Sequence, residues 1–388
     1  KLAKLRELGV DPFGGRFATD TTPGDLQEDF ADDRAVRLAG RLLAIRDMGK
    51  SVFFVIGDVH GRIQGYLNQK GVSEQDWNIW QLLDRGDWIG VEGATFTTGK
   101  GEPTVKVESL TVLSKSLRPM PDKWHGVSDR ELKYRKRHLD LMANPESADL
   151  FVLRSHILAE IRTFFHERGF LEVETPMLQD VAGGAAARPF ETHHNALDMP
   201  LTLRIAPELY LKRLLVGGFT KVFELNRNFR NEGISRRHNP EFTMLEAYWA
   251  CADFKMMAEL VEELICSLAE KFFGTLQIEH KNEEGEVIRT LDLSRPWKRA
   301  SYHDLITEVA GSDWFDLTPG ERRSKAQNEF QLEIGADLGF FSCSYNNFIN
   351  ALGFDLWNSK NCSCCSNGRC HLNPVFHSLN IVLFSDGF

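Results

Sequence analysis

Residues 229–242 have the sequence FRNEGISRRHNPEF, which gathers a guanidinium, a carboxylate, an imidazole and an aromatic ring around one short polar turn. The glycine-led turn predicts two short strands, one on each side of it. Alternation on the first strand puts Arg230 and Glu232 on one face. The returning strand brings His238 and Phe242 opposite them. Because a guanidinium grips phosphate oxygens bidentately and a flat ring stacks on a base, the stretch suits a nucleotide.

The sequence around this stretch decides its meaning, since an isolated Arg and Glu two positions apart are more often a solvated ion pair. The flanking runs are GGA at 183–185, RPF at 188–190, THHN at 192–195, RIAPELYLKR at 204–213 and TMLE at 243–246. Together these runs resemble the class II aminoacyl-tRNA synthetases in the lysyl-tRNA synthetase form, class IIb, with 229–242 as motif 2. The resemblance covers most of the chain, from about residue 36 to 338.

The resemblance implies a lysine–tRNA ligase, which activates L-lysine with ATP and passes the lysyl group to tRNA(Lys). It implies that Arg230 bridges the α-phosphate and the lysine carboxylate and that Glu232 contacts the adenine amino group. It also implies that His238 contacts the distal phosphates and that Phe242 stacks on the base. The implied ATP site is Arg230, Glu232, His238, Asn239 and Phe242, with Arg230, Glu232 and His238 as the catalytic residues.

Selecting lysine requires a negative charge where the ε-ammonium lies and an acceptor for the α-amine. By the resemblance, Glu246 with Tyr248 forms the ε-ammonium pocket, and Glu208 with Gly184 forms the α-amine site, so that the lysine-binding residues are Gly184, Glu208, Arg230, Glu246 and Tyr248. A buried carboxylate would exclude acidic and apolar amino acids. Without the resemblance, Glu246 could equally lie on the surface and Tyr248 in a core.

Composition and length predict a soluble globular protein with two or more cores, since 388 residues exceed the usual single domain. No apolar run approaches the length of a membrane span. The net charge of −9 argues against wholesale coating of nucleic acid but not against local tRNA binding. Two cysteines before residue 340 suit a reducing compartment. We expect the cytoplasm, and because the chain starts at Lys1 an organellar presequence stays open.

The first part of the chain is expected to form a small β-barrel. Residues 1–33 are interpreted as an N-terminal extension with one short helix at 2–8 and several Pro and Gly breakers, including Pro23. Residues 34–117 alternate as short strands, at 37–45, 52–58, 62–67, 88–96 and 104–113, with a helix near 75–83. Five strands with one helical patch indicate an OB-fold barrel, although another small barrel stays possible on the pattern alone.

In this barrel, Phe53, Gln64 and Glu102 match the positions at which the class IIb family contacts the anticodon. Phe53 would stack on a base and the two polar groups would bond its edge. Gly57 departs from the family, in which many members carry Gln at that position.

The rest of the chain is expected to form an α+β class II catalytic domain, an antiparallel sheet with helices, that is incomplete at its C-terminus. A linker and a basic helix at 129–142 occupy residues 118–147, and the catalytic domain with motifs 1 and 2 follows at 148–339. An amphipathic helix at 148–168 and an extended strand at 170–176 resemble motif 1, which implies a homodimer through about residues 148–180. Further helices are expected at 208–217 and 253–273.

The last segment, residues 340–388, departs from the family pattern. It carries few charges and many Phe, Asn, Ser and Cys residues, and we expect a poorly ordered tail. The family's motif 3 is not found, nor are the acidic residues that hold Mg²⁺, so the expected cofactors are ATP and Mg²⁺ without recognisable Mg²⁺ ligands. The candidate ligands of a zinc site in this tail are Cys362, Cys364, Cys365, Cys370 and His371. A zinc site is disfavoured, because these residues form one C-x₂-C knuckle rather than two.

Two alternatives to an active lysine–tRNA ligase stay open. Without motif 3, the chain could be a non-catalytic fragment that binds tRNA or forms a dimer. An aspartyl- or asparaginyl-tRNA synthetase shares the barrel and the class, but Glu246 and Tyr248 in an anionic pocket disfavour an acidic or amide substrate.

Overall fold

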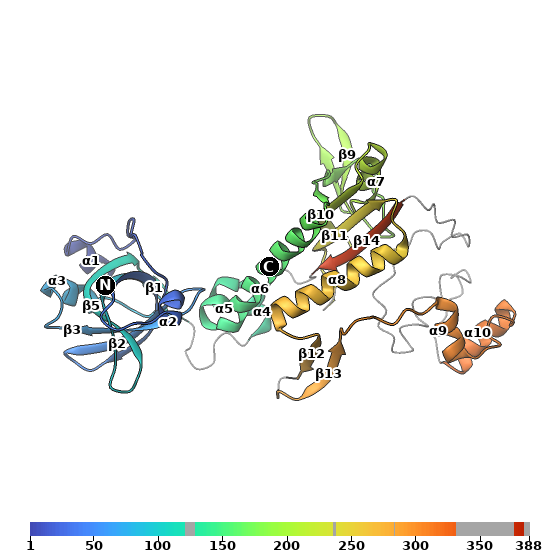
Figure 1. Cartoon of the computed structure of the whole chain (residues 1–388). Coiled ribbons are helices and arrows are strands. Elements are labelled where there is room, and N and C mark those ends of the chain that lie inside the picture. Colours follow the sequence, from blue (N-terminus) through green and yellow to red (C-terminus); the bar gives the residue numbers. More distant parts are fainter. Residues whose placement is uncertain (121–128, 236–237, 283, 331–375, 384–388) are drawn as a thin grey trace. The chain divides into compact units, whose positions relative to one another are not determined.

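The chain divides into two compact units, Lys1–Val152 and Leu153–Phe388. The structure is a computed structural model, and it describes residues 1–120, 129–235, 238–282, 284–330 and 376–383 (Figure 1).

The first unit contains a closed barrel whose strands follow the order β1-β2-β3-β5-β4. The inward side chains alternate along β1, β2 and β3, and Leu38, Ile56 and Leu67 are completely buried. This alternation is the period-2 pattern of the sequence, and it confirms the predicted OB-type barrel. The strands are β1 (Ala35–Asp47), β2 (Ser51–Gly57), β3 (Arg62–Asn68), β4 (Trp88–Thr97) and β5 (Pro103–Ser114).

Short helices add to the barrel core. The predicted helix near the start of the chain is α1 (Leu2–Glu7), and α3 (Glu74–Trp80) lies where a helix was expected. A further helix, α2 (Pro23–Glu28), begins at the proline that was predicted to break helices. Proline fits the first helical position because its missing N–H would have no partner there, and the Thr22 hydroxyl caps the helix by accepting from the Asp25 backbone N–H. Leu5 and Leu26 are fully buried in the barrel core.

The basic segment after residue 129 forms two helices, α4 (Arg130–Arg135) and α5 (Arg137–Ala143), so the prediction of one helix is wrong. The break lies at Lys136, whose backbone leaves the helical region (φ −124°, ψ 49°). Asp140 stabilises the second helix from inside, since it is buried and accepts from Arg137 and Asn144 at 2.7 and 2.6 Å. The amphipathic helix α6 (Pro145–Glu167) follows, three residues before its predicted start.

The second unit is built on a sheet with the order β14-β11-β10-β6. Its centre is the antiparallel pair β10 (Lys221–Phe229) and β11 (Glu241–Ala250), which extends over nine residue pairs from Lys221 opposite Trp249 to Phe229 opposite Glu241. The motif 1 strand predicted over 170–176 shrinks to β6 (Leu171–Glu172), and it runs parallel to β10, so the sheet is mixed.

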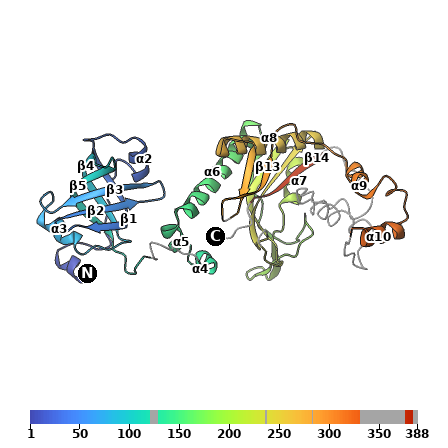
Figure 2. The same ribbon diagram turned by 90° about the horizontal axis from the view of Figure 1, so that it is seen from below.

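One face of this sheet is covered by α6 and by α8 (Phe254–Phe273) (Figures 1 and 2). The core there joins side chains of both helices to those at odd positions on the strands: Ile161, Phe164, Phe165, Phe223, Leu225, Leu245, Ala247, Leu260 and Leu264. The opposite face of β10 and β11 therefore belongs to another environment.

Smaller elements complete the described part of the unit. A three-stranded sheet contains β7 (Leu178–Gln179), β8 (Glu191–His194) and β9 (Met199–Leu203), and helix α7 (Glu208–Val216) follows it. After α8 come the hairpin β12 (Gln277–Lys281) and β13 (Val287–Asp292) and the helices α9 (Tyr302–Ala310) and α10 (Pro319–Asn328). Across the described ranges, no helix is long and apolar enough to cross a membrane.

The tail prediction is wrong for residues 376–383. These residues form β14 (Phe376–Leu383), which pairs antiparallel with β11 along its length. The cysteines and the histidine of the rejected zinc site, at positions 362–371, lie outside the described residues.

Candidate active site

The second face of β10 and β11 carries several polar side chains. The even-numbered positions face this side, because the odd-numbered ones point to α6 and α8. On β10 and just after it these are Val222, Glu224, Asn226, Asn228 and Arg230, and on β11 they are Phe242, Met244, Glu246 and Tyr248. Helix α7 packs at one end of this face, where Leu211 and Leu215 join Val222 and Tyr248 in a small core.

Arg230 lies one residue beyond the end of β10, and its backbone N–H still donates to Pro240 O at 2.8 Å, which extends the strand pair by one position. Its guanidinium carbon is 5.1 Å from the centre of the Phe242 ring. Two guanidinium nitrogens, Nε and Nη2, are buried and have no hydrogen-bond partner among the described residues. A buried, unsatisfied cationic fork of this kind suits an anion.

Burial lowers the pKa of Arg230, and the carboxylates of Glu232 and Glu246 act in the opposite direction. Even with a lowered pKa, a guanidinium keeps its charge near neutral pH.

The sequence prediction for Glu232 and His238 is only partly right. Both lie in the loop between the strands rather than on them, and both are exposed. Ser235 and His238 form an isolated bridge, and the Ser235 hydroxyl is 2.7 Å from His238 Nδ1. Asn239 donates from Nδ2 to Glu241 O at 2.8 Å, which fixes the end of the loop. The missed feature is Pro240, which accepts from the Arg230 N–H but has no backbone N–H to return a hydrogen bond, so regular pairing ends there.

Phe242 is placed on the expected face, directly opposite Asn228 in register. It is only 5% exposed, and Arg230 lies over its ring. The structure therefore brings the predicted guanidinium and aromatic ring together.

Glu246 and Tyr248 are also brought together, as predicted. Both are buried, and the Tyr248 hydroxyl donates to Glu246 Oε2 at 3.1 Å. Burial raises the pKa of Glu246 to about 8, and the charges of Glu208 and Glu224 add to that shift. The hydrogen bond from Tyr248 and the charge of Arg204 act in the opposite direction.

Gly184 and Glu208 meet at the start of α7. Gly184 has a positive φ of 87°, and a Cβ atom added to it would lie 2.9 Å from Glu208 Cβ. Only glycine fits this position without strain or displacement of Glu208. Lys212, one turn further along α7, contacts Glu208 Oε1 at 2.5 Å.

The sequence did not reveal a buried ion pair at the polar face of β10 and β11, formed by Arg204 and Glu224. Arg204 and Glu224 are almost completely buried, with Nη1 and Oε1 2.6 Å apart. The Thr175 hydroxyl donates to the other oxygen of Glu224 at 2.7 Å. Glu224 also lies directly opposite Glu246 in the strand pair. The signal in the sequence was a charged residue inside the apolar run VFEL, at the same parity as Arg230.

The predicted anticodon residues lie on the outer face of the barrel. Gln64 donates from Nε2 to the Thr104 hydroxyl at 2.8 Å, and that hydroxyl donates to Glu102 O at 3.0 Å, so Gln64 and the backbone of Glu102 are linked. The Phe53 ring is 4.9 Å from the Tyr66 ring. The Tyr66 ring is in turn 6.0 Å from that of Phe96 on β4, so Phe53 belongs to a row of three partly exposed rings. Sequence reasoning missed Tyr66 and Phe96, although Tyr66 has the parity of Gln64 on β3.

Packing explains why glycine occupies position 57, where many family members carry glutamine. A Cβ atom added there would lie 2.8 Å from Gly61 O and 3.0 Å from Leu43 Cδ1. A glutamine at this position would therefore require movement of the neighbouring turn.

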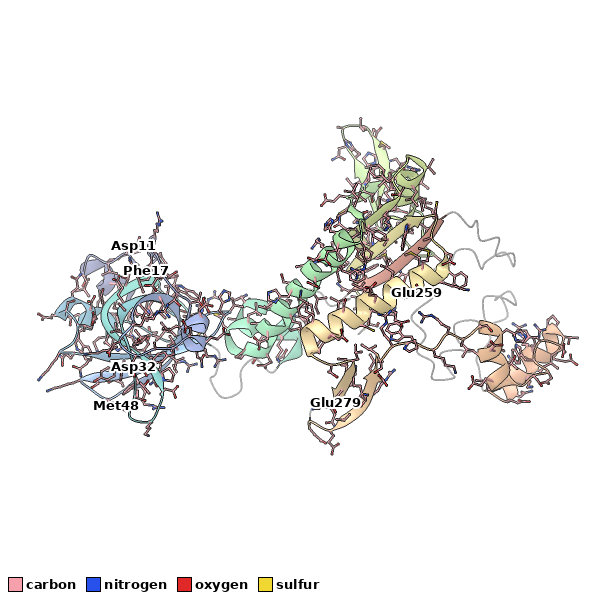
Figure 3. All side chains as sticks on the ribbon, viewed as in Figure 1. Asp11, Phe17, Asp32, Met48, Glu259 and Glu279 are labelled. Carbon is pink, nitrogen blue, oxygen red and sulfur yellow. The ribbon has the colours of Figure 1, made fainter. Side chains whose placement is uncertain are left out.

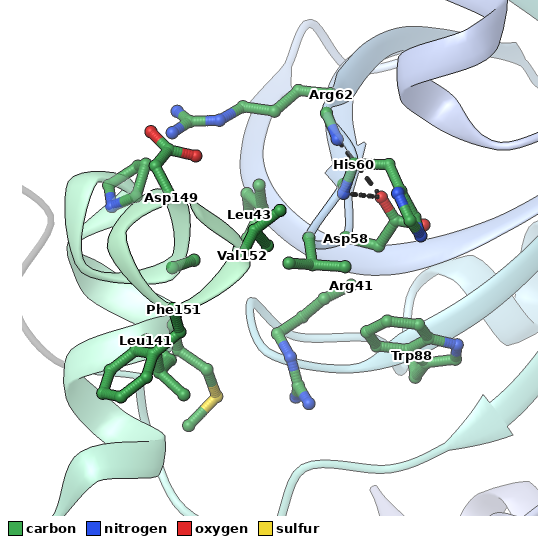
Figure 4. A pocket seen from close by; sticks show the side chains of 16 residues that line it. Arg41, Leu43, Asp58, His60, Arg62, Trp88, Leu141, Asp149, Phe151 and Val152 are labelled. Atoms are coloured by element: carbon green, nitrogen blue, oxygen red, sulfur yellow. Dashed lines mark hydrogen bonds between the residues drawn. The ribbon is translucent and has the colours of Figure 1, made fainter. Parts of the chain in front are cut away.

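The same turn borders a cavity of about 570 Å³ in the first unit (Figure 4). Arg41 and Trp88 lie at its wall, and the guanidinium carbon of Arg41 is 5.1 Å from the centre of the Trp88 ring. Burial lowers the pKa of Arg41, and the charge of Asp87 acts in the opposite direction. The turn itself is fixed by Asp58, which accepts from the backbone of His60 and Gly61. The predicted anticodon residues are not part of the cavity lining.

Within the described ranges, no group of three or more His, Cys, Asp or Glu side chains is arranged to hold a metal ion.

Comparison with known proteins finds two family models that match this chain. The family model of class II tRNA synthetases (D, K and N) matches residues 129–345, and that of the OB-fold nucleic acid binding domain matches residues 36–113.

Three similar relatives each bear the name lysine–tRNA ligase. The protein of Carboxydothermus hydrogenoformans is 52% identical over 343 residues, which is 88% of this chain and 69% of the relative. That of Syntrophomonas wolfei is 48% identical over 87% of this chain and 67% of the relative. That of Staphylococcus epidermidis is 46% identical over 88% and 70%. The chain belongs to the lysine–tRNA ligase family of class II aminoacyl-tRNA synthetases.

Proposed function

We propose that this chain binds L-lysine and ATP on the polar face of β10 and β11 and joins them as the first step in charging tRNA(Lys). The observation that carries the proposal is the Arg230 guanidinium, buried on that face with two nitrogens unsatisfied in the described structure. Activation crowds negative charge at the α-phosphorus, so a positioned cation supplies much of the catalysis.

Arg230 holds the two reacting anions together, the α-phosphate of ATP and the carboxylate of lysine. Holding both reactants in place removes much of the entropic barrier. Phe242 stacks on the adenine. Glu232 contacts the adenine amino group, and His238 and Asn239 contact the phosphates from the loop. The exposure of Glu232 and His238 leaves them accessible to a ligand.

Lysine lies along β11 from Arg230 to Glu246. The guanidinium reaches back over Phe242, and four strand positions, about 13 Å, separate Phe242 from Glu246. An extended lysine spans such a distance when each end is hydrogen-bonded. Glu246 and Tyr248 bind the ε-ammonium, and Glu208 beside Gly184 accepts from the α-amine.

The outer face of the barrel binds the anticodon of the tRNA. The row of three rings offers stacking surfaces, and Gln64 with Glu102 supplies polar contacts at one side. Base stacking on aromatic side chains is worth about 1–3 kcal/mol per base.

The chain forms a homodimer through the region of α6, β6 and β7. Leu171 and Leu178 support this proposal, because both are large, apolar and about half exposed. A contact with a second copy would remove them from water.

The discriminating experiment is lysine-dependent exchange of pyrophosphate into ATP by this chain. Exchange that requires lysine, and that Arg230→Ala abolishes, supports the proposal. Exchange without lysine dependence contradicts it.

A second candidate function is a non-catalytic tRNA-binding protein. The closed barrel with its complete row of rings favours it, since that surface does not depend on the second unit. Tight binding of tRNA(Lys) by a chain that shows no exchange would identify this function.

A further inference from the structure

Asn228 presents a second unsatisfied group on the same face as Arg230. It is 1% exposed, and both its Oδ1 and its Nδ2 are buried without a hydrogen-bond partner in the part of the chain that the structure describes. Buried amides are almost always hydrogen-bonded, because a buried amide without a partner loses its hydrogen bonds to water and gains none in return. An orphaned amide inside a candidate site therefore calls for a partner.

The strand pair places Asn228 beside the guanidinium of Arg230. The two residues are two positions apart, so they share a face and lie about 6.6 Å apart along the strand. Phe242 is the direct cross-strand neighbour of Asn228, and the guanidinium carbon of Arg230 lies 5.1 Å from the Phe242 ring. The guanidinium is thus folded back toward the pair formed by Asn228 and Phe242.

The unsatisfied atoms of the two residues are chemically complementary. Arg230 has buried N–H donors at Nε and Nη2, and Asn228 has a buried acceptor at Oδ1. A hydrogen bond from one of these guanidinium donors to Asn228 Oδ1 would pair two of the unsatisfied atoms and would leave the other buried guanidinium nitrogen for the ligand.

We propose that Asn228 is a positioning residue for Arg230: its Oδ1 accepts from the inward side of the guanidinium and fixes the orientation in which Arg230 binds the carboxylate of lysine. This inference rests on the proposed function of Arg230. Asn228 itself does not touch the substrate; it acts through Arg230.

The test is calorimetric titration of this chain with lysine and with lysinamide, which lacks the anionic carboxylate. Asn228→Ala is expected to weaken lysine binding about tenfold, the usual effect of losing a hydrogen bond to a charged group, and to change lysinamide binding less than twofold. In an Arg230→Ala background, Asn228→Ala is expected to have no further effect on lysine binding. Asn231→Ala is the matched control, since Asn231 adjoins Arg230 but is exposed.

The outcomes separate this inference from the proposed function. If wild-type chain does not bind lysine, both fall. If Arg230→Ala weakens lysine binding and Asn228→Ala does not, only the role of Asn228 falls. Equal losses for lysine and lysinamide, or effects of the two substitutions that add, would also overturn it by showing a general structural role. Should Asn228→Ala fail to fold, Asn228→Ser, which leaves a smaller gap, replaces it in the same comparison.

Discussion

Single residues carry the chemistry of the site, and Glu246 makes the sharpest prediction among them. Its carboxyl has a pKa raised to about 8, so at pH 7 it is mostly neutral in the empty site. An ammonium group beside it favours the ionised form, and lysine binding is therefore expected to release a proton at pH 7. Lysine affinity should fall by up to about tenfold for each pH unit below 8. Titrations in buffers with different ionisation heats measure the released proton, and a flat affinity from pH 6 to 9 would contradict the prediction.

The same shift affects the stability of the empty protein. The folded pKa of Glu246 lies above its ordinary value of 4.5, so the folded state favours the protonated form. The contribution of Glu246 to the free energy of unfolding is therefore fully present below pH 4.5 and is lost as the pH rises toward 8. Glu246→Gln, which stays neutral, is expected to gain stability relative to wild type as the pH is raised from 6 to 9. Urea unfolding at the two pH values measures the difference, and a constant difference would show that Glu246 ionises normally.

Glu246→Gln should also weaken lysine binding about 100-fold, because it removes the charge partner of a buried ammonium. ATP binding, measured by the same titration, should change less than twofold. A loss of ATP affinity equal to that of lysine would place Glu246 outside the lysine pocket.

At this scale the sequence predicted correctly which side chains of the two strands share a face. Phe242, Glu246 and Tyr248 share one face, as expected from their spacing. Glu232 and His238 were misplaced onto strands, because the residue pattern does not reveal where backbone pairing stops. Arg204, Glu224 and Asn228 were missed because burial and unsatisfied hydrogen bonds are properties of the fold and not of the residue type.

Among the secondary-structure elements, the barrel offers a test of tRNA recognition. Phe53→Ala breaks the row of rings at its β2 end and is expected to weaken tRNA(Lys) binding by about tenfold, the cost of one lost stacking contact. Lysine-dependent exchange should stay unchanged, since no described contact joins Phe53 to Arg230. Phe13→Ala, which removes an exposed phenylalanine outside the row, is the control. Equal losses in tRNA binding and in exchange would argue against an anticodon surface.

Helix α8 anchors the segment that leads to α9 and α10. The buried Glu262 accepts from Arg295 and Arg299 at 3.1 and 2.6 Å. Burial raises the pKa of Glu262. The hydrogen bonds from the two arginines outweigh this effect, so the pKa is lowered overall. Glu262→Gln should release the segment, because a neutral amide holds two guanidinium groups poorly. Trypsin is expected to cut after Lys298 and Arg299 several times faster.

Glu259→Gln is the control for that experiment, because Glu259 lies on the same helix and is exposed (Figure 3). Equal cleavage rates of wild type and Glu262→Gln would show that the segment is held by other contacts.

The elements themselves were mostly predictable. Five barrel strands and the helices α6, α7 and α8 match their expected ranges within a few residues, since hydrophobic periodicity and glycine turns mark them clearly. The break at Lys136, the start of α2 at Pro23 and the short β6 were not predictable, because each depends on local capping or on tertiary contacts. The strand β14 was missed since its pairing partner lies more than 120 residues earlier in the chain.

For the whole molecule, we predict a dimer. Leu171→Asp should raise the dissociation constant of that dimer about 100-fold, because it would bury an unpaired carboxylate in an apolar contact. Sedimentation velocity at micromolar concentration measures the change. Met48→Asp, at an exposed turn of the barrel, is the control (Figure 3). A wild-type chain that sediments as a monomer, or a Leu171→Asp chain that stays dimeric, would contradict the proposed interface.

At this scale, sequence reasoning reached the family because several spaced runs matched it together. The chain spans about two thirds of the length of the curated relatives that it matches. Composition alone predicted only a globular protein with more than one core, since net charge and apolar content are averages over the whole chain.

The most direct test of the central claim is a crystal structure of this chain with bound lysine. We expect lysine on the polar face of β10 and β11, with its carboxylate on Arg230 and its ε-ammonium on Glu246 and Tyr248. Lysine bound in the reverse orientation, or bound elsewhere on the molecule, would contradict it.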